Sequence, residues 1–405
     1  MEPLSGGMEE KMKAFVLGAG AQGATTASIL AKDERAEKIV LADINLEAAE
    51  KVRDKIGSEK VSAIKTDATD IGQIAEAAQG CDVIFDLSMT WLTVNVMKAA
   101  LKVKAHYVNT AFDEPFWGQI LRGESLELAD EFKEAGLTAL LGCGGTPGML
   151  NVYVRRYCDK LDSVESIKLR GGSYSKTPMP LIGPWDPGWA PAQALIDYIT
   201  EPVQFKDSKF EKTAIFAEPE EFDFGPGVGK IWIAHHSHEE TYSLPYTIGK
   251  GISHCEFKYD LDVKAGTFIS MGFTPDNEIE VKGTKIKPFD VLIALTDNPG
   301  DMFLAEEPPS QKELNYGYMS FIEIEGEKDG AEKSFKVQVP PLDQDALATY
   351  EACGTVMVYV SLPAVLGGVM CLEGTETGVI FAEQLDPERF IELLNEKFPY
   401  DVNEL

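Results

Sequence analysis

A glycine-rich turn between a short apolar strand and an alanine-rich helix most constrains how this chain folds. Residues 13–31 read KAFVLGAGAQGATTASILA and place Gly18, Gly20 and Gly23 in the spacing GxGxxG. In this pattern the first glycine permits a tight turn, the second lets the backbone approach a pyrophosphate, and the third lets the helix pack close to the strand. We therefore expect a dinucleotide-binding strand–helix–strand unit. The alternative is a glycine-rich turn in another type of α/β protein.

An acidic residue at the end of the next strand supports this interpretation. Residues 38–43 read KIVLAD and end in Asp43, 20 residues after Gly23, where an acid bonds a ribose 2′-hydroxyl. No Arg or Lys occupies residues 44–46, so nothing there is placed to bind a 2′-phosphate. The sequence predicts NAD as the cofactor in preference to NADP, with its pyrophosphate at Ala21 and Gln22, where the helix begins.

The length and charge of the chain argue against several classes of protein. Its 405 residues exceed one ordinary core and indicate two domains. The formal net charge of −29 argues against nucleic acid or an anionic membrane surface as a partner. No apolar run reaches the ~18 residues that a membrane span needs, and the acidic N-terminus is unlike a signal peptide. The six cysteines form no CxxC pair, so we expect reduced thiols in a cytoplasmic protein.

The alternation of apolar runs divides the chain into regions. Over residues 12–150, strands and helices alternate about six times, which predicts an α/β fold with a doubly wound parallel sheet of the Rossmann type. From 151 to about 350, strands interrupted by Gly and Pro predict a mixed α+β sheet domain. A long apolar helix over 346–371 and a tail helix over 386–397 are expected to end the chain.

Several further segments carry a resemblance to a known family. They are GGTPGMLN at 144–151, ESIKLRGGS at 165–173, FGPGVGKIWIAHHSHEET at 224–241, GTKIKPFDVL at 283–292 and GTETGVIFAEQLDPERF at 374–390. Together with VLGAGAQG at 16–23, they resemble the saccharopine dehydrogenase-like NAD(P)-dependent oxidoreductases, with lysine 6-dehydrogenase as the nearest type. The resemblance covers nearly the whole chain from about residue 12.

The resemblance implies an architecture and an activity. Residues 12–150 would be the Rossmann domain, 151–350 an inserted domain for substrate binding and homodimer formation, and 351–405 a segment that returns to the Rossmann domain. The implied substrate is a small amine or amino acid, whose C–N bond is oxidised as in lysine 6-dehydrogenase. Two alternatives stay open: a reductive condensation of an amine with a carbonyl compound, as in saccharopine or carboxyspermidine formation, and a dinucleotide-binding protein without turnover.

Polar residues after successive strands are candidates for contacts with the cofactor and the substrate. In a doubly wound sheet the ligand lies at the carboxyl ends of the strands. We expect Asp67 near the adenine, Ser88 at a ribose, and Asn109 and Thr110 at the nicotinamide or the substrate. Ordinary turn chemistry is the competing explanation for each of them.

The turn at residues 144–149, GGTPGM, bears on the type of reaction. Pro147 is expected to shape this turn beside the cofactor. By the resemblance, the saccharopine and carboxyspermidine reductases of the family have an Asp-Pro-Gly sequence there. This chain has Thr146 in place of the acid, and lysine 6-dehydrogenase-like members also lack the acid. The missing carboxylate counts against a reductase that depends on it.

The run HHSHEET at residues 235–241 holds three of the five histidines in the chain. By the resemblance, His236 corresponds to a family histidine five positions before Thr241. We expect both to be catalytic, with His236 as the acid–base group. An imidazole with a pKa near 6.5 is suited to that role. A structural histidine, or a zinc site built from His235, His236 and His238, are the alternatives; we expect no metal ion.

Two further charged residues are candidates for substrate binding. Glu240 is placed to bind a cationic amine, with a solvated charged rim as the alternative. Arg170 follows an apolar strand and is suited to hold a substrate carboxylate through two parallel hydrogen bonds, with surface ion pairing as the alternative.

Overall fold

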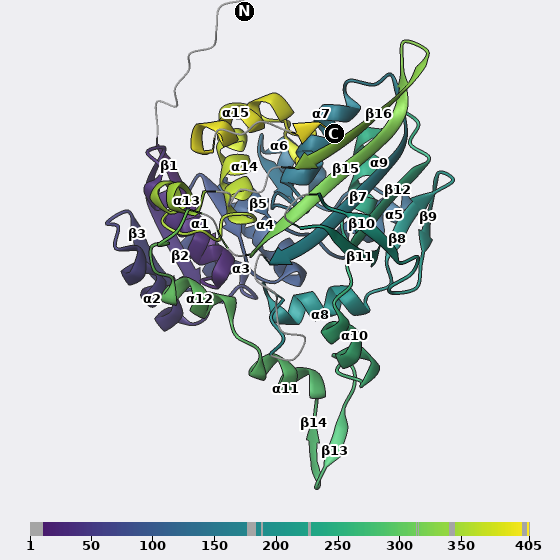
Figure 1. The fold of residues 1–405 in the computed structure, drawn as a ribbon. Helices are drawn as coiled ribbons and strands as arrows, with labels where there is room; N and C mark the ends of the chain where they lie inside the picture. The colour runs from purple at the N-terminus through teal and green to yellow at the C-terminus, as the bar shows by residue number, and fades with distance from the viewer. Residues whose placement is uncertain are drawn as a thin grey trace, which may run out of the picture. The chain divides into compact units, whose positions relative to one another are not determined.

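The computed structural model describes residues 11–175, 184–187, 189–225, 228–312, 314, 316–339, 345–398 and 403–404, and these form two compact units. The first unit contains the described residues within 11–156, 303–312 and 345–398. The second contains those within 157–302, 314–339 and 403–404. Figure 1 shows the elements of both.

The first unit is built on a parallel sheet, which confirms the predicted doubly wound fold. Its seven described strands follow the order β17-β6-β5-β4-β1-β2-β3, and every pairing is parallel. Strands buried on both faces explain the uninterrupted apolar runs in the sequence. The strands are β1 (Met12–Leu17), β2 (Ala36–Asp43), β3 (Val61–Lys65), β4 (Val83–Asp86), β5 (His106–Asn109), β6 (Thr138–Leu141) and β17 (Gly378–Phe381).

Ten helices accompany these strands in the described part of the first unit. They are α1 (Ala21–Lys32), α2 (Leu46–Ile56), α3 (Ile71–Ala77), α4 (Thr93–Val103), α5 (Phe116–Arg122), α6 (Ala129–Glu134), α7 (Met149–Cys158), α13 (Ala346–Cys353), α14 (Ser361–Gly374) and α15 (Pro387–Lys397). Short 3₁₀ turns lie at Thr90–Leu92 and Ala382–Gln384. Among the described residues, no helix combines the length and the apolar character that crossing a membrane requires.

The C-terminal segment returns to the parallel sheet, as expected. Strand β17 pairs with β6, and α14 packs beside α1. A Cβ at Gly368 would lie 2.5 Å from the ring of Phe85, so glycine there lets α14 approach the sheet closely. The apolar stretch predicted as one helix over 346–371 forms two, because Gly354 adopts a φ of 75° and ends α13.

The second unit contains a mixed sheet, again as predicted. Among the described residues, its strands follow the order β10-β11-β12-β7-β15-β16-β18, with β8 on β12 and β9 on β8. Strand β7 pairs in parallel with β12 and antiparallel with β15. The strands are β7 (Ser163–Ser175), β8 (Val203–Lys206), β9 (Lys209–Lys212), β10 (Glu220–Asp223), β11 (Lys230–His235), β12 (His254–Asp260), β15 (Tyr316–Lys328), β16 (Ala331–Val339) and β18 (Asn403–Glu404).

Four helices and a hairpin accompany this sheet in the described part of the second unit. The helices are α8 (Pro191–Ile199), α9 (Glu240–Ile248), α10 (Val263–Ser270) and α11 (Pro288–Leu295). The hairpin consists of β13 (Ile279–Val281) and β14 (Thr284–Ile286), and Figure 1 shows it projecting beyond α10 and α11. Helix α12 (Pro299–Ala305) runs across the boundary between the units in the chain. Helix α9 packs against β8 and β12, which places its first residues beside the sheet.

Candidate cofactor and substrate sites

The turn between β1 and α1 has the geometry that the glycine motif requires. Gly18 adopts a φ of 99°, in the left-handed region that favours glycine. A Cβ at Gly23 would lie only 1.7 Å from the carbonyl oxygen of Gly18, so strand and helix touch there. No atom lies within 4 Å of the position of a Cβ at Gly20, which leaves this backbone open to a ligand.

The N-terminus of α1 is suited to an anion. Gly20 is its N-cap, no side chain caps the helix, and its first turn has no acidic residue. The first backbone N–H groups of a helix lack intrahelical partners and carry partial positive charge. Gln22 is held in place by the C-terminal segment, since Ser361 Oγ lies 2.7 Å from its Oε1 and 3.0 Å from its carbonyl oxygen. A dinucleotide pyrophosphate fits these features.

Asp43 ties the end of β2 to the glycine turn. Its Oδ2 accepts the N–H of Ala19 at 2.7 Å, and its Oδ1 accepts the N–H of Asn45 at 2.8 Å. The carboxylate is partly exposed and lies beside the turn, as a residue that bonds a ribose hydroxyl must. The next side chain, Ile44, is 64% exposed and offers an apolar surface at the same place.

A chain of hydrogen bonds crosses the carboxyl ends of β4, β5 and β6. Ser88 Oγ donates to Asp86 Oδ1 at 2.5 Å, and the hydroxyl of Tyr107 donates to Asp86 Oδ2 at 2.8 Å. Asn109 donates to that hydroxyl at 3.1 Å and accepts the N–H of Gly142 at 2.8 Å. Burial raises the pKa of Asp86, although its three hydrogen bonds oppose the rise.

These hydrogen bonds give Asn109 a structural part, and its role at the nicotinamide or substrate stays a prediction. Its amide is 3% exposed, and both of its ends bond within the protein, so it orients the loop that begins at Gly142. Thr110 follows it and is half-buried. Asp67 accepts the N–H and the hydroxyl of Thr69 at 2.9 and 2.7 Å, which is ordinary turn chemistry.

The loop at 142–148 contacts the returning C-terminal segment. The hydroxyls of Thr146 and Tyr359 lie 3.2 Å apart, and a Cβ at Gly145 would lie 2.2 Å from a ring atom of Tyr359. Pro147 follows a cis peptide bond in this loop. Sequence reasoning missed Tyr359 and Ser361, because no local signal links them to residues more than 200 positions earlier.

In the second unit, the run HHSHEET joins β11 to α9 and builds a buried acid–base cluster. His238 Nδ1 lies 2.5 Å from Glu240 Oε2, and its ring stacks on Phe257 with 4.3 Å between centroids. Burial lowers the pKa of His238, but Glu240, with Glu239 and Asp197, outweighs that effect and raises the pKa to about 9. His238 is therefore an imidazolium at neutral pH.

Two carboxyl groups of this cluster are unusual. Glu240 is fully buried, and its Oε1 has no hydrogen-bond partner among the described residues. Burial raises the pKa of Glu239 to about 8, although His238 opposes the rise. An unpaired buried carboxylate oxygen is costly, so a ligand that donates a proton or a hydrogen bond would stabilise the cluster.

His236 and Thr241 have environments that differ from their expected roles, which stay predictions. His236 packs against the rings of Tyr198 and Tyr259, at centroid distances of 4.7 and 5.1 Å. Burial, and then His238, lowers its pKa to about 3, so the ring is neutral at neutral pH. Thr241 Oγ1 donates to the carbonyl of His238 at 2.9 Å and so orients the cluster.

Further acidic and aromatic groups lie close to His236. Burial raises the pKa of Asp260 to about 7, although the backbone N–H of Ser173 opposes the rise and Asp262 adds to it. Tyr198 donates its hydroxyl to the carbonyl of Asp260 at 3.1 Å and stacks on Phe216. The sequence offered no signal for Asp260, because it lies in an ordinary strand end.

Arg170 does not present a free guanidinium. The residue is 4% exposed, and its Nη2 lies 2.5 Å from Glu256 Oε1 while its Nε lies 3.3 Å from Glu220 Oε1. Its charge is thus already balanced by carboxylates of β12 and β10 in the same sheet. The predicted contact between Arg170 and a substrate carboxylate would require that these ion pairs open.

Known proteins match this chain both within its first unit and over nearly its whole length. Residues 14–140 match the model of the saccharopine dehydrogenase NADP binding domain. The chain is 24% identical to carboxyaminopropylagmatine dehydrogenase of Synechocystis sp., over 96% of this chain and 99% of that one. It is also 24% identical to carboxynorspermidine synthase of Vibrio cholerae, over 95% of this chain and 94% of that one.

Two solved structures share the fold. Saccharopine dehydrogenase (L-Glu forming) from Saccharomyces cerevisiae matches with a TM-score of 0.68 and 17% identity, over 97% of this chain and 99% of that one. The homospermidine synthase from Legionella pneumophila, solved in complex with NAD, matches with a TM-score of 0.62 and 13% identity, over 98% of this chain and 91% of that one. An NAD(P) cofactor is therefore supported by the family model as well as by the glycine turn.

Proposed function

We propose that this chain, a member of the saccharopine dehydrogenase-like family of NAD(P)-dependent oxidoreductases, reductively condenses a primary amine with a carbonyl compound. The sequence had favoured oxidative deamination, with condensation as an alternative. The order is reversed because relatives that align over almost their full length are named for carboxylated polyamine derivatives, which contain a secondary amine. We infer that the amine substrate is a diamine or an agmatine-like cation and that the carbonyl partner carries a carboxylate.

The unpartnered Oε1 of Glu240 is the observation that carries the proposal. An ammonium or guanidinium group has only donors, so it is the natural partner for a buried carboxylate oxygen. Glu239 and Asp260 add acidic groups whose pKa values are raised to about 8 and about 7 by burial, and a nearby cation would favour their ionised forms. Aromatic rings at Tyr198 and Tyr259 are suited to the aliphatic stem of such an amine and to its charge.

The proposed chemistry needs a proton donor. The amine attacks the carbonyl carbon, water leaves, and the resulting imine accepts a hydride at carbon and a proton at nitrogen. His238 is suited to protonate the departing hydroxyl, because Glu240 keeps it charged at neutral pH. His236 stays a predicted participant in acid–base catalysis, with a neutral ring next to that of His238. The dinucleotide supplies the hydride when it is bound, and the α1 N-terminus with Asp43 would hold it.

The proposal includes NAD as the preferred form of the cofactor. The partly exposed Asp43 carboxylate would repel a 2′-phosphate, and residues 44–46 offer no cation to bind one. A homodimer and a cytoplasmic location complete the proposal. The six cysteines are buried thiols, which suits a reducing compartment.

A second candidate function is oxidative deamination of the lysine 6-dehydrogenase type. Thr146 favours it. This side chain places a hydroxyl next to Tyr359, at the position where the resemblance implies an aspartate in the condensing reductases of the family. In this reaction the amine alone, with NAD, would be oxidised to an imine that hydrolyses.

A matrix of substrates tests both. The purified full-length chain is incubated with NADH or NADPH, an amine (1,3-diaminopropane, putrescine, agmatine or lysine) and a carbonyl compound (aspartate 4-semialdehyde or 2-oxoglutarate). A parallel series contains NAD and the amine alone. Loss of absorbance at the reduced-nicotinamide band that requires both partners, with the secondary amine found by mass spectrometry, supports condensation. Reduction of NAD by an amine alone supports deamination instead. Cofactor binding without either signal refutes both and leaves a dinucleotide-binding protein without turnover.

A further inference from the structure

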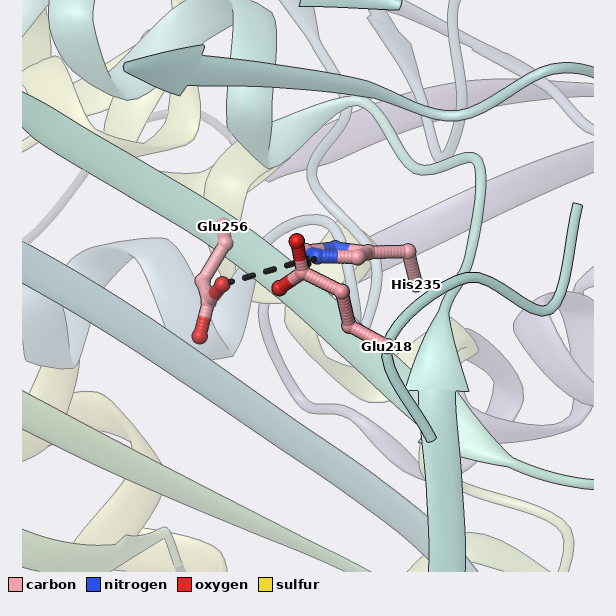
Figure 2. Close-up of side chains that lie close together, drawn as sticks. All are labelled: Glu218, His235 and Glu256. Atoms are coloured by element: carbon pink, nitrogen blue, oxygen red, sulfur yellow. Dashed lines mark hydrogen bonds and ion pairs between the residues drawn. The ribbon is translucent and has the colours of Figure 1, made fainter. Parts of the chain in front are cut away.

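A second cluster of ligand-type side chains lies in the second unit, apart from the α9 cluster. His235 ends β11, Glu256 lies within β12, and Glu218 lies between β9 and β10. Figure 2 shows the three side chains converging, with the carboxylates of Glu218 and Glu256 directed at the imidazole. His235 Nε2 lies 3.3 Å from Glu218 Oε2 and 3.8 Å from Glu256 Oε2. One donor atom of each of the three lies within 4.8 Å of those of the other two.

A fourth ligand-type group stands beside these three. His254 lies two residues before Glu256 on β12, so both side chains share one face of the sheet. Its Nε2 lies 3.4 Å from Glu256 Oε2, the same oxygen that faces His235. His254 therefore lies beside Glu256 but outside the set of three donor atoms that are close to one another. The ligands of a tetrahedral zinc ion at 2.0–2.2 Å are separated by about 3.3–3.6 Å, close to the distances from His235 to the two carboxylates.

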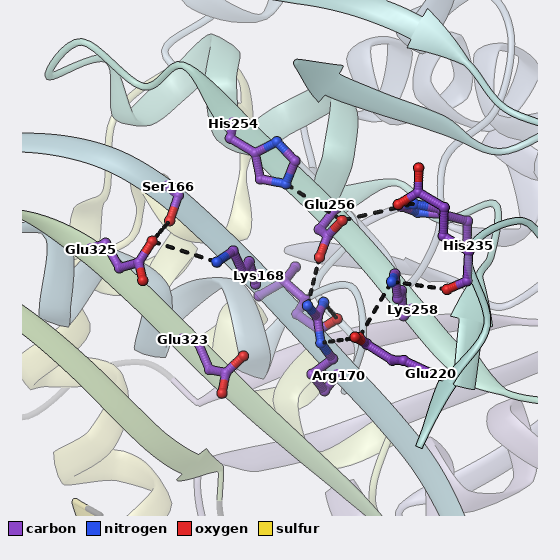
Figure 3. A network of polar contacts seen from close by, with 12 residues as sticks. Ser166, Lys168, Arg170, Glu220, His235, His254, Glu256, Lys258, Glu323 and Glu325 are labelled. Carbon is purple, nitrogen blue, oxygen red and sulfur yellow. Dashed lines mark hydrogen bonds and ion pairs between the residues drawn. The ribbon is translucent and has the colours of Figure 1, made fainter. Parts of the chain in front are cut away.

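The charges around the cluster leave one carboxylate without a cation. Arg170 Nη2 bonds the other oxygen of Glu256 at 2.5 Å, and Lys258 Nζ pairs with Glu220 at 3.3 Å (Figure 3). Lys258 reaches only the backbone carbonyl of Glu218, at 3.0 Å. The two cations thus balance Glu220 and Glu256, whereas the side chain of Glu218 meets His235 alone among the described residues for which contacts are given.

The two carboxylates differ in their other partners. Glu256 Oε2 has His254 Nε2 beside it at 3.4 Å as well as His235, whereas Glu218 Oε2 faces the His235 ring. The His235 side chain is 1% exposed, whereas that of Glu218 is 62% exposed, which gives an ion a route from solvent. Glu218 also adopts a φ of 48°, a costly conformation for a residue with a side chain.

We propose that Glu218, His235 and Glu256 bind one zinc ion, with a water molecule as the fourth ligand. Two carboxylates and an imidazole suit a divalent ion of this kind, and the two carboxylate charges leave the bound group neutral. Arg170 would act from behind by orienting Glu256, as outer partners of metal ligands do. The ion would fasten the segment between β9 and β10 to strands β11 and β12. The zinc site considered from the sequence had different ligands, since His236 and His238 instead pack against Tyr259 and Phe257.

Titration calorimetry of the chelator-treated full-length protein with zinc chloride tests the proposal. We expect one ion per chain, about tenfold or more weaker binding in Glu218→Gln, and no binding in His235→Gln. Glu218→Gln is the safer variant for folding because the residue is exposed. Cobalt(II) serves as a second readout, since a four-coordinate site gives a visible absorption band that both variants should lose.

Two control variants make the result specific. Glu323→Gln removes a carboxylate of the same sheet that pairs with Lys336 at 3.2 Å, and it should bind zinc like the wild type. His238→Gln removes the histidine of the other cluster of potential ligands, His238, Glu239 and Glu240, and should also leave binding unchanged. Absence of zinc binding in the wild type, or wild-type binding in His235→Gln, would overturn the proposal, as would loss of binding in His238→Gln with His235→Gln unaffected.

Discussion

The pairing of His238 with Glu240 leads to a prediction that needs no knowledge of the substrate. In the folded protein the pKa of His238 is raised to about 9 from an ordinary 6.5. The difference of about 2.5 corresponds to roughly 3 kcal/mol in favour of the imidazolium. Burial acts in the opposite direction, so the substitution Glu240→Gln should bring the pKa of His238 to 6.5 or below.

Proton NMR of the protein labelled with [13C]histidine measures this directly, because the chain has only five histidines. The wild type should show one ring that titrates near pH 9, and His238→Gln should remove that signal. In Glu240→Gln the signal should move to pH 6.5 or lower, while Glu323→Gln should leave it near 9. An unchanged midpoint in Glu240→Gln would refute the assignment of Glu240 as the group that keeps His238 charged.

The same pair affects stability in a defined pH range. Because the folded-state pKa of His238 is raised, its contribution to the free energy of unfolding is fully present below pH 6.5 and is lost as the pH rises through about 9. The difference in thermal midpoint between wild type and Glu240→Gln should therefore shrink between these values. A difference that stays constant from pH 6 to pH 10 would contradict this coupling.

Three further substitutions test the cofactor site. Gly23→Ala places a Cβ 1.7 Å from the carbonyl oxygen of Gly18, so we expect the protein to lose about 1–3 kcal/mol of stability and to lose NAD binding. Thermal unfolding measures the stability, and a wild-type midpoint would contradict this. Asp43→Ser should lower the KM for NADPH relative to the KM for NADH. An unchanged ratio of the two KM values would argue against Asp43 as the ribose ligand. Ser361→Ala should weaken NAD binding several-fold, about 1 kcal/mol, by releasing Gln22 while thermal stability stays nearly unchanged; unaltered affinity would separate the C-terminal segment from the site. Gly20→Ala is the matched control for Gly23→Ala, since nothing lies within 4 Å of its Cβ and the fold should tolerate it.

The features that could be predicted from the sequence depend on neighbours along the chain. The glycine turn needs only residues 18–23 between a strand and a helix, and the place of Asp43 follows from the length of α1 and β2. The alternation of apolar runs predicted the parallel sheet, because strands buried on both faces must be apolar throughout. The run HHSHEET stood out as a candidate site, because it holds three of the five histidines of the chain beside two acids, and its role stays a prediction.

The tertiary structure decided which of those residues are paired, charged or reachable. In the sequence, His236 and His238 look equivalent. In the structure, Phe257 and Glu240 surround the ring of His238, whose pKa is about 9. Tyr198 and Tyr259 surround the ring of His236, whose pKa is about 3.

Arg170 has a partner, Glu256, that lies 86 residues away in the chain. Burial and charge depend on distances between side chains, and strands brought together by folding set those distances. For that reason the sequence by itself determined the fold class and the dinucleotide turn, whereas the acid–base pair and the histidine–carboxylate cluster at Glu256 exist only in the folded chain.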